Sequence, residues 1–198
     1  TPFNEFYDTR AYAYGLELLF KKTAGRTRGW VGYTYAKTMK HIEKHGWYFP
    51  LYDRTHTLNI VGDITISVKN NVHFSTAVQA SSGQPFTPPI GRYDHWQADH
   101  NPHMPAWYWN ENFLVGQKNS ERLPFYFRLD VGLKQKKSIF GIPYERYLQL
   151  INITNHVNPL TYRYQAKENR LTGETLGLER AALPMFPFFF TAGYRIEL

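Results

Sequence analysis

Cysteine is absent from the 198-residue chain. This absence excludes disulfide bonds, thiolate zinc sites and a cysteine nucleophile. The chain also lacks any run of about 18 or more apolar residues, so the sequence offers no transmembrane helix. None of the GxSxG, HExxH, Walker A and GxGxxG patterns is present. Because these patterns carry the catalytic or phosphate-binding groups of common enzyme classes, we expect no enzymatic activity and no cofactor.

Aromatic residues, in contrast, are abundant: Tyr, Phe and Trp make up 17% of the chain. Rings with an apolar body and a polar tip suit both membrane headgroup regions and sugar-binding surfaces. The formal net charge of +7 is compatible with an anionic surface or an anionic ligand. Lys and Arg are scattered along the chain rather than arranged in a stripe, so we expect no nucleic-acid partner.

The clearest pattern is the alternation of apolar and polar residues at the end of the chain. Counted back by twos from the last residue, every position is apolar: Leu198, Ile196, Tyr194, Ala192, Phe190 and Phe188. This period of two predicts a strand with one apolar and one polar face. Similar alternation predicts six further strands, within residues 12–21, 27–41, 57–66, 72–78, 125–134 and 144–154. In the strand at 144–154, two sets of apolar residues compete for the apolar face.

Most of these strands approach the length of about 9 to 11 residues that a transmembrane strand needs. Short links near 23–26, 68–71 and 137–143 alternate with long links near 42–53, 80–124 and 155–186. Periplasmic turns and longer extracellular loops give bacterial outer-membrane barrels this sidedness. We therefore expect an all-β fold, an antiparallel transmembrane β-barrel segment with long extracellular loops. Because bacterial single-chain barrels close with an even number of strands, seven strands indicate part of a larger barrel.

Eight short segments of the chain together resemble the C-terminal barrel portion of a TonB-dependent outer-membrane receptor, of the type with a carboxypeptidase-regulatory-like domain. They are GLE at 15–17, GYTY at 32–35, DRTHTLN at 53–59, SGQPFT at 82–87, NSERLP at 119–124, YFRLD at 126–130, ITNHVNP at 153–159 and LPMFP at 183–187. The resemblance depends on their order and spacing over nearly the whole chain. The strand that ends the chain also resembles the assembly signal of such barrels, through Gly193, Tyr194, Ile196 and Leu198.

The resemblance implies a plugged barrel of 22 strands in the bacterial outer membrane, which takes up a scarce solute such as a siderophore, glycan or peptide. The implied partners are the remainder of the barrel and the plug domain (on the same or another chain), the TonB system acting through that plug, lipid and lipopolysaccharide, and a surface lipoprotein. One alternative is a non-transporting barrel component that serves as a surface scaffold. Another is a soluble lectin-like module with an aromatic cleft.

Two sets of residues are candidate sites. The first lies in the longest predicted loop, where rings can stack on a ligand or form an aromatic core of the loop: Tyr93, His95, Trp96, His100, His103, Trp107, Tyr108 and Trp109. Three of these are His, but we expect no metal because scattered His rarely coordinate one. The second set consists of polar residues that alternate with the apolar residues of the predicted strands. These residues are expected to face the lumen: Glu17, Asn59, Asp63, Arg128, Asp130 and Lys134. His41, Glu43 and His45 are expected on one face of a strand end, solvated rather than bound to zinc.

Overall fold

The computed structural model describes residues 8–97, 108–168 and 175–196. Its main sheet is antiparallel and contains seven long strands: β1 (Thr9–Lys22), β2 (Thr27–Ile42), β4 (His56–Ser67), β5 (Val72–Ser81), β10 (Tyr126–Ile139), β11 (Ile142–Ile151) and β14 (Phe189–Ile196). The expected all-β, antiparallel architecture with seven long strands is confirmed. No helix in the described part of the chain is long and apolar enough to span a membrane.

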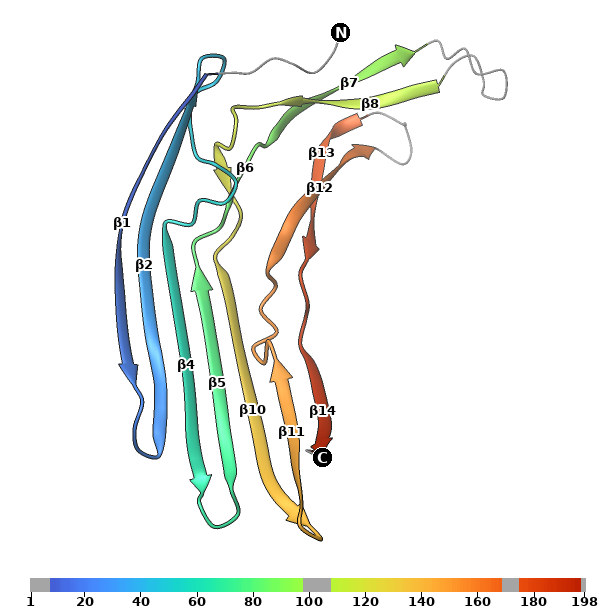
Figure 1. Cartoon of the computed structure of the whole chain (residues 1–198). Coiled ribbons are helices and arrows are strands. Elements are labelled where there is room, and N and C mark those ends of the chain that lie inside the picture. The colour runs from blue at the N-terminus through green and yellow to red at the C-terminus, as the bar shows by residue number, and fades with distance from the viewer. Residues whose placement is uncertain (1–7, 98–107, 169–174, 197–198) are drawn as a thin grey trace.

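The long strands lie side by side in the order β1-β2-β4-β5-β10-β11-β14 (Figure 1). A short strand, β3 (Gly46–Tyr48), pairs with the last residues of β2. Within the described residues, β1 and β14 are the two edges and the sheet does not close on itself. Each edge therefore presents backbone groups that a further strand can pair with.

Two of the three long links, 80–124 and 155–186, are more ordered than the expectation of loops suggests, because many of their residues form paired β-strands. The paired strands are β6 (Pro85–Phe86) with β9 (Glu121–Arg122), β7 (Pro89–Gln97) with β8 (Tyr108–Val115), and β12 (Pro159–Glu168) with β13 (Thr175–Pro184). Pairing satisfies backbone N–H and C=O groups that an irregular loop would leave to water. Figure 1 shows β7, β8, β12 and β13 at one end of the sheet, which we call the hairpin end. The short turns lie at the opposite, turn end.

The turn between β10 and β11 contains only Phe140 and Gly141. Their φ angles are 52° and 81°. Two consecutive positive φ values in a two-residue hairpin are typical of a type I′ turn, whose twist matches that of the flanking strands. Because this turn is so tight, the strands continue into residues 137–143, which the sequence analysis assigned to a link.

Register assigns the side chains of the sheet to two faces, since directly paired residues of neighbouring strands share a face. One register row that crosses five strands is apolar throughout: Phe20, Val31, Ile60, Val78 and Leu129. We call this side the apolar face. The row beside it runs through Asn59, Gln79 and Arg128 and belongs to the opposite, polar face.

Register also settles the ambiguous strand, β11. Leu148 and Leu150 pair with Leu133 and Val131 on the apolar face. Tyr147 pairs with Lys134 and therefore lies on the polar face. Sequence periodicity alone fails here because both faces of β11 carry large apolar groups.

Charge is distributed unequally between the two faces. All four carboxylates of the seven long strands lie on the polar face: Glu17, Asp63, Asp130 and Glu145. The apolar face has only cations, near the strand ends: Arg10 and Lys37 at the hairpin end, and Lys22, Lys137 and Arg146 toward the turn end.

The described part of the chain has almost no apolar core. Apart from Pro50, Pro85 and Pro159, its buried apolar residues are Tyr48, Ala80 and Leu123. On the apolar face, by contrast, Leu16 is 57% exposed and Phe20 and Phe190 are 70% and 68% exposed. The sheet therefore buries little apolar surface within itself and leaves a large apolar face exposed.

Candidate functional site

All six residues expected to face the lumen lie on the polar face, and the structure brings four of them together in two ion pairs. Asp63 accepts a hydrogen bond from His73 at 3.1 Å and lies 3.7 Å from the ammonium group of Lys134. Arg128 donates three hydrogen bonds to Asp130, the shortest at 2.5 Å. Asn59 is opposite Gln79 in register, and Glu17 is opposite Thr34 on the edge strand.

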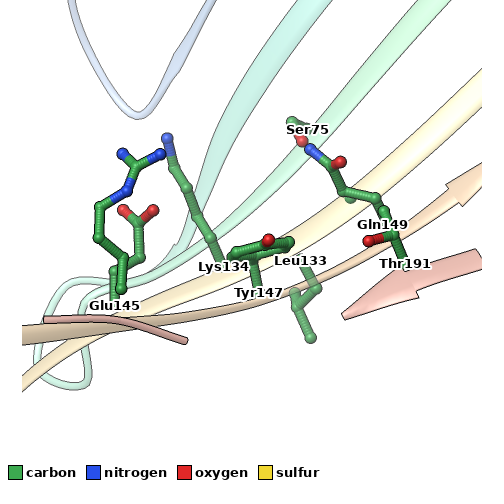
Figure 2. Close-up of a pocket in the computed structure, with 9 residues that line it drawn as sticks. Ser75, Leu133, Lys134, Glu145, Tyr147, Gln149 and Thr191 are labelled. Carbon is green, nitrogen blue, oxygen red and sulfur yellow. The ribbon is translucent and has the colours of Figure 1, made fainter. Parts of the chain in front are cut away.

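A groove of about 270 Å³ runs along the polar face near the turn end. Figure 2 shows Lys134, Glu145 and Gln149 projecting into it from β10 and β11, whereas Leu133 points to the other side of the sheet. Thr191 and Arg195 of β14 complete the lining. Charged and hydrogen-bonding groups of both signs therefore border this groove.

At the hairpin end, three segments that are far apart in the sequence meet in a buried ionic cluster, which we call the rim cluster. The carboxylate of Asp53 is 1% exposed and accepts a 2.5 Å hydrogen bond from Arg122. It also accepts a bond of 2.8 Å from the backbone N–H of Thr38. Arg122 in turn donates to the carbonyl of Gly83 at 3.0 Å. This cluster attaches β9, the strand that follows the β7–β8 hairpin, to β2 of the main sheet.

Arg54 extends the rim cluster to β5. Its guanidinium donates to the hydroxyl of Ser81, the carbonyl of Ser82 and the side-chain oxygen of Gln84, at 3.2 to 3.4 Å. Between these groups, Gly83 is packed so closely that a Cβ there would overlap the carbonyl of Leu123. The position requires glycine because backbone, not a movable side chain, fills the space.

Asn119 anchors the other side of the same strand pair. Its side chain donates a 2.6 Å hydrogen bond to the carbonyl of Phe49, and its N–H donates to the hydroxyl of Thr87 at 3.0 Å. The ring of Phe49 also lies 4.6 Å from the guanidinium of Arg122. Polar and cation–π contacts therefore join the link at 42–53 to the base of the β7–β8 hairpin.

A second buried cluster holds the β12–β13 hairpin. Asn152 is 1% exposed, and its N–H donates to Asp130 at 2.9 Å. Its side-chain amide donates to the carbonyls of His156 and Phe186. The amide of Asn158 accepts from the N–H of Phe127 and donates to its carbonyl, at 2.9 and 2.7 Å. Asn158 thus replaces the neighbouring strand at a point where β11 has already ended.

The residues of the longest predicted loop are only partly described. Tyr93 is 47% exposed on β7 and pairs in register with Asn112. The backbones of Trp96 and Trp109 pair directly, as do those of His95 with Asn110 and Gln97 with Tyr108. His100, His103 and Trp107 lie outside the described residues. The hypothesis of ring stacking on a ligand therefore stays a prediction.

A cluster of aromatic rings joins the base of the β7–β8 hairpin to the β12–β13 hairpin. The ring of Phe86 lies 5.5 Å from that of Tyr162, and the guanidinium of Arg180 lies 4.8 Å above Tyr162. Arg180 also approaches Glu121 of β9 at 3.7 Å. Burial raises the pKa of Tyr164 above its ordinary value of 10, so this phenol is neutral next to Arg180.

The described residues contain no group of three or more His, Cys, Asp or Glu placed to hold a metal ion. The expectation that His41, Glu43 and His45 share one strand face is wrong, because β2 ends at Ile42 and a turn follows. His41 instead packs against Trp47, with ring centroids 5.1 Å apart.

Three residues of the expected assembly signal are described. Tyr194 and Ile196 lie on the apolar face of β14, 74% and 62% exposed. Gly193 lies on the polar face, where the ring of Tyr147 covers it, so that a Cβ would be 2.7 Å from the phenol oxygen. Leu198 lies outside the described residues.

Sequence reasoning did not select the residues of the two buried clusters as a site. Asp53, Arg54, Arg122 and Asn158 lie in the segments that carry the family resemblance and Asn152 directly precedes one of them, all just outside the long strands. Their position was a usable signal, since a charged or amide side chain at a strand end satisfies the backbone groups released there. Their partners, however, depend on contacts between distant segments.

Comparison of the chain with protein-family models, with curated proteins and with solved structures gave no match.

Proposed function

We propose that this chain is the C-terminal part of the β-barrel of a TonB-dependent outer-membrane receptor, which takes up a scarce solute. In this proposal, lipid covers the apolar face and the polar face borders the lumen. The hairpin end is extracellular, and further strands pair with β1 and β14 to complete the barrel. The chain has no catalytic role.

The observation that carries the proposal is the exposed apolar face without a carboxylate. In water, a face with Leu16, Phe20 and Phe190 more than half exposed would drive aggregation. In a bilayer it is favourable, and barrel strands show this alternation of lipid-facing apolar and lumen-facing polar residues. A soluble lectin-like module would instead need polar residues where Leu16, Ile60 and Leu129 stand.

The rim cluster supports the receptor assignment more specifically. The residues that form it come from three of the segments that resemble the family: Asp53 and Arg54, then Gly83 and Gln84, then Arg122. These residues hold the base of the extracellular hairpins. The resemblance therefore falls on groups with a common physical role, rather than on scattered surface positions.

The test is to isolate outer membranes, denature them fully, and measure the mass of the polypeptide that yields peptides of this chain. We expect it in the outer-membrane fraction, several times heavier than 23.3 kDa, with peptides of a plug domain upstream. Recovery in the aqueous fraction would contradict the membrane role. A membrane species of 23.3 kDa without plug peptides would contradict the receptor role and favour the scaffold alternative.

A further inference from the structure

A small apolar platform interrupts the polar face where β1 and β2 pair. Leu19 and Trp30 both lie on this face, and their side chains approach each other over Gly32. A Cβ added to Gly32 would lie 3.1 Å from Cζ3 of Trp30 and 3.8 Å from Cδ1 of Leu19. The six-membered ring of the Trp30 indole therefore covers the backbone of Gly32, and Leu19 is 67% exposed beside it. The platform is open to a ligand.

A pocket of about 330 Å³ lies next to this platform, since Asn59 lines the pocket and is paired in register with Gly32. Gln79, which pairs with Asn59 from the other side, and Thr57 also line it. Among the described residues, the side chains of Asn59, Gln79 and Thr57 have no hydrogen-bond partner. Each amide offers both donors and an acceptor, and the hydroxyl can act as either. The pocket therefore presents a row of neutral groups whose hydrogen-bonding capacity is unused.

The charged side chains around the pocket and the platform are paired or balanced. Arg54 lines the pocket, but its guanidinium already donates to three groups of the chain at 3.2 to 3.4 Å. Arg128, which follows Gln79 in the same register row, is bonded to Asp130. On β1, Glu17 and Lys21 lie on either side of Leu19 and carry opposite charges. A solute with a net charge therefore meets no surplus of the opposite charge here.

We propose that the platform and the pocket together bind a neutral glycan, and that such a glycan is the solute this chain recognises. One sugar ring stacks its apolar C–H face on Trp30, and the next sugar ring hydrogen-bonds through its hydroxyls to Asn59 and Gln79. The register row from Gly32 through Asn59 to Gln79 covers two strand spacings, or roughly 10 Å. This width suits two linked sugar rings. Peptides with charged termini and ionic metal complexes fit the charge balance of the site less well.

This inference rests on the proposed function, because it names the class of solute that enters the lumen. The two can fail separately. Recovery of the protein from the aqueous fraction would remove the receptor role, whatever the protein binds. An outer-membrane protein with plug peptides that binds no neutral glycan at this site would remove only the present inference.

The test is isothermal titration calorimetry of the full-length protein in detergent micelles. The neutral probes are four hexasaccharides of different linkage or sugar: maltohexaose, cellohexaose, laminarihexaose and mannohexaose. Hexagalacturonate is the anionic glycan of the same length, and hexaalanine is the peptide. We expect at least one neutral hexasaccharide to bind at least about ten-fold more tightly than hexagalacturonate and hexaalanine, since neither charged probe finds a surplus of opposite charge. Tighter binding of the acidic glycan or the peptide, or no binding of any neutral hexasaccharide, would overturn the proposal.

Variants locate the binding on the platform and the pocket. Trp30→Leu removes the ring but keeps an apolar side chain, and we expect a loss of about five-fold in affinity for the bound hexasaccharide. Asn59→Leu with Gln79→Met removes both amides at similar shape, with an expected loss of about ten-fold. Trp47→Leu is the matched control, because Trp47 packs against Tyr12 on the apolar face, and it should bind as the unaltered protein does.

The shift in electrophoretic mobility on heating shows whether each variant is folded. Unchanged affinity in a folded Trp30→Leu variant would overturn the proposal, and so would an equal loss in Trp47→Leu.

Discussion

Asp53 and Arg122 are 69 residues apart in the sequence, yet their side chains form a 2.5 Å ion pair. The pair is unequal, since the Asp53 carboxylate is 1% exposed and the Arg122 guanidinium 29%. The buried Asp53 carboxylate therefore depends on Arg122 to compensate for its lost hydration. Because this ion pair joins the main sheet to the base of the β7–β8 hairpin, its loss should loosen that hairpin first.

Arg122→Gln leaves the buried carboxylate without its counter-charge. Removal of one partner of a buried ion pair costs about 3–5 kcal/mol, and we expect a loss in this range, at its lower end because Arg122 is partly exposed. Urea titration of the protein in detergent measures it. Arg180→Gln is the comparison variant, because its pair with Glu121 is exposed and contributes about 0–1 kcal/mol, and its cation–π contact with Tyr162 adds about 0.5–1 kcal/mol. Comparable losses in the two variants would contradict the role given to Asp53.

Gly83→Ala should separate β9 from the rim cluster. The added Cβ overlaps the backbone carbonyl of Leu123, so β9 or the segment at Gly83 has to move and the 3.0 Å bond from Arg122 to Gly83 is lost. We expect limited proteolysis to cut faster within residues 85–122 while the long strands stay protected. Gly25→Ala is a useful comparison, since no atom lies near its Cβ position, although its φ of 90° adds some strain. Unchanged proteolysis of Gly83→Ala would refute the close packing at this point.

Phe140→Asn should stabilise the turn between β10 and β11. Phe140 has a φ of 52° and is 99% exposed, so its ring gains little from contacts in the chain. Left-handed backbone costs a residue like Phe about 1–2 kcal/mol, and Asn tolerates it better. We expect the unfolding midpoint in urea to rise slightly. A lower midpoint would mean that the ring is stabilised by something beyond this chain, such as the membrane interface at the turn end.

Neighbouring residues of β5 allow a direct comparison of the two faces. Val78 lies in the apolar row with Ile60 and Leu129, and Gln79 lies in the polar row with Asn59 and Arg128. Val78→Arg places a charge on the face that we propose meets lipid, at a cost of about 2–4 kcal/mol if the position is near the bilayer midplane. Gln79→Arg should be tolerated. Refolding into lipid vesicles, followed by the shift in electrophoretic mobility on heating, measures both, and equal effects would contradict the assignment of the faces.

The long strands could be predicted from the sequence because one face is apolar and the other polar. Leu16, Leu18 and Phe20 alternate with residues such as Glu17 that belong to the other face. This pattern is local, so it can be recognised without knowledge of tertiary contacts. The β12–β13 hairpin had a similar signal in Leu160, Tyr162 and Tyr164, which alternate with polar residues. The sequence analysis predicts a loop for residues 155–186 because of the length of this link, and this prediction overlooks the hairpin signal.

The buried clusters could not be predicted in the same way. The sequence marks Asp53 and Arg122 as charged residues beside strands, but their contact depends on how the links fold back over the sheet. The faces of β11 also required the register, since Tyr147 and Leu148 are both large and mainly apolar. Both the ion pair and the faces of β11 therefore depend on contacts between segments that are distant in the sequence.

The most direct test of the proposed membrane role compares two adjacent residues of β4, Ile60 and Asn59. These 198 residues contain no cysteine, so Ile60→Cys and Asn59→Cys each introduce a single label site within them. In membranes, a label at residue 60 should collide with oxygen, which partitions into lipid, and one at residue 59 with a water-soluble nickel chelate. We expect this opposite preference in power-saturation measurements. If the chelate reaches residue 60 as readily as residue 59, the apolar face does not meet lipid and the membrane role is contradicted.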